Sequence, residues 1–136
     1  MSEIKVDKLT GKTSAGNITV TSEGSAATMQ LQQGLAKAWF NFTGRGTAAL
    51  VDNLNITSLT DNGTGSFNLS YVANMNNSTY SFSNGQGWDV GVTNSTTSGT
   101  DKDFITTSSL RVLHVNMGDA AYDPDVSFGS VHGDLS

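Results

Sequence analysis

The sequence predicts an all-β protein: an antiparallel β-sandwich, jelly-roll-like in form, that carries an extended N-terminal arm. Three observations predict this class. Apolar residues recur with a period of two in several short segments, as they do in strands with one buried face. Ser, Thr, Asn and Gly, which are common in the turns and loops between such strands, make up 61 of the 136 residues. A helical pattern occurs at one place only, between residues 28 and 35.

The arm is predicted at residues 1–30, which contain two short alternating segments joined by a turn-rich link. Ile4 and Val6 mark the first segment, and Ile18 and Val20 mark the second. So few large apolar side chains cannot close a core, and the strands therefore need a partner surface. We predict that these four residues lie in an interface.

The next segment, TMQLQQGL, is ambiguous. Met29, Leu31 and Leu35 can share one face of a helix, and Gly34 can end it. A helix of this length is too short to be stable alone in water. An extended conformation is equally consistent with the sequence.

Residues 31–136 are predicted to form the sandwich, which acts as a knob. In its first strand Ala38, Phe40 and Phe42 share one face, and Trp39 lies on the other. Trp39 and Phe40 lie on opposite faces, so one of the two points away from the core of the domain unless both faces are covered. We favour an interface for Trp39, within the sandwich or between subunits, over a sugar-binding platform.

Further strands follow in the same period. An Asn-Gly turn at residues 62–65 predicts a hairpin, because Asn and Gly readily adopt positive φ. The segments with strand character are 54–61, 66–72, 79–83, 88–92, 103–117 (one long strand or two) and 126–133. Short strands separated by turn residues are typical of sandwiches and rolls.

The composition excludes several functions. The net charge is −5, and the seven Lys and Arg form no basic stripe, so we expect no nucleic-acid partner. The chain contains no cysteine for a disulfide or a zinc–thiolate site. No apolar run is long enough to span a membrane, and the N-terminus lacks the apolar stretch of a signal peptide. These features predict folding in a cytoplasm.

Catalytic residues are scarce. Of the two histidines, His114 alternates with Val112, which indicates a structural histidine in a sheet, and His132 lies in no recognised motif. The sequence has no GxSxG nucleophile elbow. We therefore expect no enzymatic activity and no cofactor.

An acidic segment, GDAAYDPD, holds the three residues that we consider as metal ligands: Asp119, Asp123 and Asp125. Calcium prefers several carboxylate and carbonyl oxygens on one loop, but the spacing here does not match an EF-hand. A solvated acidic loop is the default interpretation, and no metal site is predicted.

A thin core points to association with identical chains. Only 36% of the residues are hydrophobic, which is low for a globular domain, while 14% are charged, too few for a typical disordered chain. Burial between copies would supply the apolar contacts that one chain lacks.

The region 31–72 resembles a module of bacteriophage tail-fibre and related virion proteins. In both, a Lys-Ala-Trp strand (residues 37–39) precedes a Gly-rich turn, the sequence TDNGTG (residues 60–65) and an aromatic alternating strand with Phe67, Leu69 and Tyr71. The first thirty residues are similar to N-terminal segments of fibre-like proteins from marine phages. The resemblance supplies no catalytic residues.

The resemblance implies a β-rich homotrimer on the virion surface, assembled in the host cytoplasm and attached to capsid or tail proteins through its arm. Trp88 or the polar loop at residues 93–103 would contact a host receptor or glycan. The alternative role is capsid decoration, in which the protein stabilises the head without a host ligand. An enzymatic role such as a depolymerase is disfavoured, because paired carboxylates and histidines are few.

Overall fold

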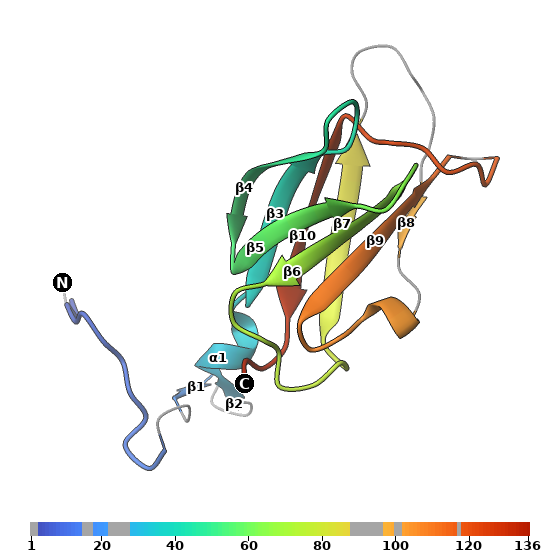
Figure 1. Ribbon diagram of the computed structural model, residues 1–136. Helices are drawn as coiled ribbons and strands as arrows, with labels where there is room; N and C mark the ends of the chain where they lie inside the picture. Colours follow the sequence, from blue (N-terminus) through green and yellow to red (C-terminus); the bar gives the residue numbers. More distant parts are fainter. Residues whose placement is uncertain (1–2, 15–17, 22–27, 88–96, 100–101, 117) are drawn as a thin grey trace. The chain divides into compact units, whose positions relative to one another are not determined.

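A computed structural model describes residues 3–14, 18–21, 28–87, 97–99, 102–116 and 118–136 (Figure 1). The chain divides into two compact units, Met1–Leu35 and Ala36–Ser136. We describe each unit by itself.

The first unit contains a two-stranded antiparallel sheet of β1 (Thr19–Thr21) and β2 (Thr28–Gln30), in which Val20 pairs with Met29. A single helical turn, α1 (Leu31–Gly34), follows directly. The Leu31 N–H donates to the carbonyl of Ile18 at 2.7 Å and ties the turn to the sheet. The two interpretations of TMQLQQGL therefore each hold for half of the segment. The strand expected around Ile4 and Val6 is absent from residues 3–14, where no neighbouring strand pairs with the backbone.

The second unit is a β-sandwich of two four-stranded antiparallel sheets, as the sequence predicts (Figure 1). One sheet has the order β4–β3–β10–β7, and its strands are β3 (Ala38–Thr43), β4 (Ala49–Leu54), β7 (Ser81–Gly87) and β10 (Val126–His132). The other has the order β5–β6–β9–β8, and its strands are β5 (Ile56–Asp61), β6 (Ser66–Tyr71), β8 (Thr97–Gly99) and β9 (Ser109–Val115). A short 3₁₀ turn, η1 (Lys102–Phe104), precedes β9.

The strand order differs from the jelly-roll-like order that we expected. A jelly roll contains two Greek keys. Here β10 pairs with both β3 and β7 in one sheet, and β9 pairs with both β6 and β8 in the other. Strands β3 to β6 instead form two successive hairpins, β3–β4 and β5–β6. Each of these hairpins lies within one sheet, and the step from β4 to β5 passes from one sheet to the other.

The crossing from β4 to β5 takes one residue, Asn55, which adopts φ 60°. Asparagine tolerates this left-handed conformation better than other residues with a side chain. Its Nδ2 donates to the carbonyls of Lys37 at 3.1 Å and Ala73 at 3.0 Å, and its Oδ1 accepts from the Ala73 N–H at 2.7 Å. The side chain thus links the beginning of β3 to the end of β6.

The predicted hairpin turn at residues 62–65 is confirmed, since it joins β5 to β6. The Asn62 N–H donates to the Ser66 carbonyl at 2.8 Å. Gly63 and Gly65 both have positive φ, of 109° and 72°. A Cβ on Gly65 would lie 2.5 Å from the carbonyl oxygen of His114, so the backbones approach too closely for a side chain.

The core lies between the two sheets. The shared face of Ala38, Phe40 and Phe42 is the inner face of the first strand, because these residues are at most 2% exposed. The Phe42 ring packs on Phe67 from the opposite sheet, with ring centroids 5.1 Å apart. The other large core residues are Ile56, Leu69, Tyr71, Met75, Tyr80, Leu110, Val112 and Val131.

Two segments differ from their predicted bounds. Residues 103–117 contain one strand, β9, preceded by η1. Strand β7 begins after Tyr80 and continues to Gly87, beyond the predicted end at residue 83. The strand predicted at residues 88–92 lies outside the described residues.

Candidate functional site

A hollow of about 490 Å³ lies on the outer face of the β4–β3–β10–β7 sheet. Strands β3, β10 and β7 form its floor, and their paired residues follow one another in rows. Trp39 pairs with Ser130, which pairs in turn with Ser83. In the next row on this face Asn41 pairs with Phe128, which pairs with Gly85.

Phe128 is the most exposed aromatic residue of the hollow. Its side chain is 49% exposed, although it lies in the middle of a strand. A Cβ on Gly85 would lie 2.7 Å from two carbons of the Phe128 ring. The ring therefore lies across Gly85 on the neighbouring edge strand, in the arrangement by which an aromatic residue covers an edge glycine.

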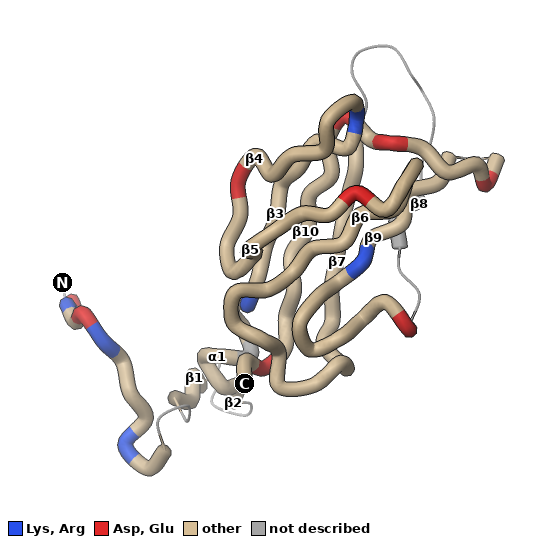
Figure 2. Tube along the Cα trace, viewed as in Figure 1, with Lys and Arg blue, Asp and Glu red and all other residues tan. Residues whose placement is uncertain are grey.

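The polar groups around the rings are uncharged. Strands β3, β7 and β10 carry no Lys, Arg, Asp or Glu (Figure 2). The hydroxyl oxygens of Ser83 and Ser130 lie 3.2 Å apart in a hydrogen bond. The hollow thus combines aromatic surface with hydroxyl and amide groups, and these groups recognise polar, uncharged ligands.

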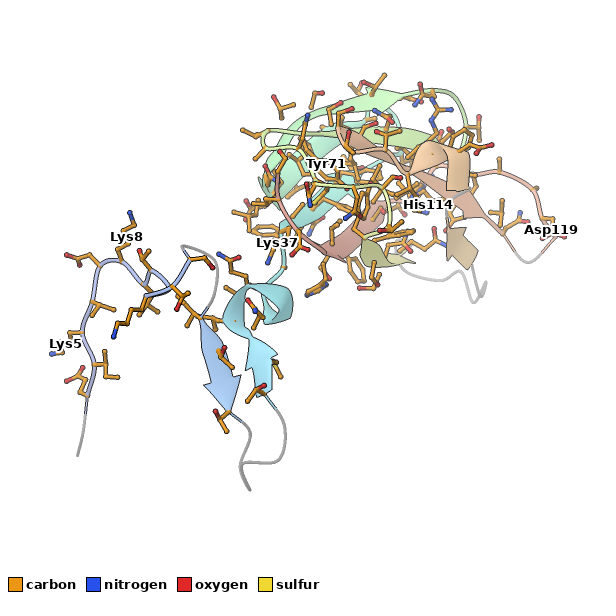
Figure 3. All side chains as sticks on the ribbon, turned by 90° about the horizontal axis from the view of Figure 1, so that it is seen from below. Lys5, Lys8, Lys37, Tyr71, His114 and Asp119 are labelled. Atoms are coloured by element: carbon orange, nitrogen blue, oxygen red, sulfur yellow. The ribbon has the colours of Figure 1, made fainter. Side chains whose placement is uncertain are left out.

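A second group of polar residues is buried between the sheets. His114 is completely buried in the core, and its ring lies 6.1 Å from that of Phe42 and 5.9 Å from that of Phe67, centroid to centroid (Figure 3). Its Nδ1–H donates to Oε1 of Gln86 from the opposite sheet. The predicted structural histidine in a sheet is thus confirmed.

Burial sets the charge of His114. Loss of solvation lowers the pKa of the imidazole to about 4, although the negative charge of Asp123 acts in the opposite direction. The ring is therefore neutral at pH 7. Because it is completely buried, a substrate in solvent cannot reach it to transfer a proton. This arrangement serves packing.

The three aspartates do not converge on a common point. Asp119 lies on an exposed loop, apart from His114 (Figure 3). The carboxylate of Asp123 accepts the Gly65 N–H at 2.7 Å, and that of Asp125 pairs with Arg45 at 3.2 Å. Among the residues that the structure describes, no three potential metal ligands form a cluster. Asp123 and Asp125 therefore hold turns in place.

The other residues predicted to act in binding are widely distributed. Ile4, Val6 and Val20 are exposed, Ile18 is half-buried, and Trp39 forms part of the hollow. Trp88 lies outside the described residues, as does most of the loop at 93–103.

Sequence reasoning missed Phe128 as a surface residue. The segment VSFGSVHG has large apolar residues at Phe128 and Val131, which fall on opposite faces of one strand. The alternation alone does not tell which face is the core. Gly129 was the available signal, because its Cβ position is filled by Phe40 from the core side.

A scan against protein-family models, a search of curated proteins and a search of solved structures find no match to the chain. In the described part of the chain, no helix has the length and apolar character needed to cross a membrane.

Proposed function

We propose that this chain is a bacteriophage virion protein that forms a homotrimeric surface appendage, a short fibre or knob. Its N-terminal unit anchors in the particle, and its sandwich faces outward for adhesion to the host. The observation that carries the proposal is the division of the chain into two units of different character, Met1–Leu35 and Ala36–Ser136.

The N-terminal unit supports an anchoring role through its exposed apolar residues. Ile4 is 86% exposed, Met29 61%, Val6 55% and Val20 45%. Apolar side chains concentrated on so short a segment gain free energy when another surface removes them from water. Subunit neighbours and the virion proteins of the capsid or tail are the partners that we propose.

The sandwich supports the role of an outward head. Its core is closed around Phe40, Phe42 and Phe67, so these three rings need no partner to remove them from water. The absence of cysteine suits assembly in the reducing cytoplasm of a host cell. We propose a non-covalent role for the head, without enzymatic activity or a cofactor.

The anchoring role is tested with a variant that keeps the length of the chain: Ile4→Ser, Val6→Ser and Val20→Ser together. We expect the wild-type protein to scatter light as a trimer at micromolar concentration and to bind particles, and the triple variant to do neither. The matched control is Val51→Ser with Val72→Ser, since these residues are 67% and 70% exposed on the sandwich. A wild-type monomer that unfolds cooperatively would contradict the proposal.

Capsid decoration is the alternative, and particles that lack the protein distinguish it. Adhesion predicts that such particles attach more slowly to host cells and withstand heat as before. Decoration predicts normal attachment and earlier loss of the genome on heating.

A further inference from the structure

The hollow on the outer face of β3, β10 and β7 has the size and the charge of a site for a small neutral molecule. Its volume of about 490 Å³ falls within the range of roughly 300–1,000 Å³ that is common for ligand sites. None of the described residues that line it is charged. An anionic or cationic ligand would lose its hydration there without gaining an opposite charge.

Aromatic rings form the apolar part of the hollow. Phe128 and Trp39 are diagonal neighbours on paired strands, because Trp39 pairs with Ser130, two residues along β10 from Phe128. Diagonal neighbours lie about 7–8 Å apart in a sheet. One ligand ring can therefore contact both aromatic side chains.

The Phe128 ring packs against the backbone of the neighbouring strand β7. It lies across Gly85, where a Cβ would meet the ring at 2.7 Å, and it is still 49% exposed. Part of the aromatic surface is thus fixed on the sheet and open to solvent. Such a surface can contact the C–H groups of a ligand at a small cost in side-chain entropy.

The polar part of the hollow consists of groups that both donate and accept hydrogen bonds. Ser83 and Ser130 offer hydroxyls that already bond to each other at 3.2 Å, and Asn41 lies in the neighbouring row. Hydroxyl and amide groups match the hydroxyls of a sugar, which also donate and accept.

We propose that this hollow binds the pyranose ring of a neutral sugar, with its C–H face on Phe128 and Trp39 and its hydroxyls toward Ser83, Ser130 and Asn41. The proposal deepens the adhesive role proposed above and rests on it for its biological meaning. It also revises the interpretation of Trp39, for which the sequence favoured an interface.

A concave, uncharged surface favours a sugar over a second copy of the sandwich. Asp52 on β4 pairs with Asn41 at the border of the hollow, so a second copy that covered this face would bury its carboxylate beside strands that carry no Lys or Arg. Such burial without a partner charge is costly.

The test uses the purified full-length protein and methyl glycosides of glucose, galactose, mannose, N-acetylglucosamine and N-acetylgalactosamine. Each is titrated into the millimolar range while backbone amide resonances are recorded by NMR. We expect at least one glycoside to shift the amides of residues 39–41, 83–85 and 128–130. Phe128→Ala should weaken its binding at least tenfold, and Val72→Ala, which changes an exposed side chain outside the hollow, should leave it within twofold.

Gly85→Ala provides a second variant that keeps both aromatic residues. Its methyl group displaces the Phe128 ring, so we expect weaker binding from a folded protein. The proposal is overturned if no glycoside shifts these amides, if Phe128→Ala binds as the wild type does, or if the amides shift with protein concentration alone. Absence of sugar binding by the wild-type protein, with normal attachment to particles, would refute this site only. Sugar binding without attachment to particles would refute the virion role only.

Discussion

His114 and Gln86 join the two sheets through a hydrogen bond between their side chains inside the core. The bond requires a proton on Nδ1, because Oε1 of Gln86 can only accept. The pKa of His114 is lowered by burial to about 4, below its ordinary value of 6.5. Between pH 4 and pH 6.5 the unfolded chain therefore binds a proton that the folded chain does not bind.

Stability should consequently fall as the pH decreases from 6.5 toward 4. We expect His114 to account for a loss of about 2 kcal/mol in the free energy of unfolding by pH 5. Urea denaturation at pH 7, 6 and 5 measures it. His114→Gln should be less stable than the wild type at pH 7, but its free energy of unfolding should decrease less on acidification. The control His132→Gln changes an exposed residue and should follow the wild type. Equal acid sensitivity of His114→Gln and the wild type would argue against this assignment.

Asn55 is expected to be intolerant of alanine. Asn55→Ala removes three hydrogen bonds to Lys37 and Ala73 and leaves a residue with a Cβ at φ 60°. We expect a loss of about 2–3 kcal/mol in the free energy of unfolding. Asn55→Gly accepts the backbone angle and loses only the hydrogen bonds, so it should cost less. If the two variants were equally stable, the conformation would not contribute.

Gly65 and Gly63 form a matched pair in one turn. Both have positive φ, but a Cβ on Gly63 meets nothing within 4 Å, whereas one on Gly65 meets the backbones of His114 and Tyr122. Gly65→Ala should therefore cost about 1–3 kcal/mol more than Gly63→Ala, the amount typical of overpacking. Thermal unfolding of the two variants compares them directly, and similar melting temperatures would show that the strands can separate at this point.

Tyr71 and Tyr80 should resist ionisation. Burial raises the pKa of both hydroxyls, and their rings pack edge to face with centroids 6.0 Å apart. Because the unfolded chain releases these protons more readily, stability should fall as the pH rises above about 10. Absorbance of tyrosinate followed with pH should show that Tyr71 and Tyr80 ionise only as the protein unfolds. Normal titration of Tyr71 and Tyr80 in the folded protein would contradict this expectation.

Local patterns predicted much of the sandwich. The alternation around Phe40 predicted which residues share a face but not which face is the core, and the Asn-Gly turn predicted the β5–β6 hairpin. The second half of β7 was not predicted from the sequence. Its Gln86 forms a hydrogen bond with His114 in the core, and His114 is 28 residues away along the chain. The strand expected at Ile4 and Val6 failed for the opposite reason, since no neighbouring strand pairs with it. The hollow depends on Phe128 and Gly85, whose relationship arises only when β10 pairs with β7.

The passage through Asn55 also has a consequence for how the sandwich comes apart. Because a single residue joins β4 to β5, neither strand can leave its sheet without displacing the other. The two sheets are in this way mechanically coupled along a shared border. The sandwich should accordingly melt in a single cooperative event, with no state in which one sheet survives the loss of the other.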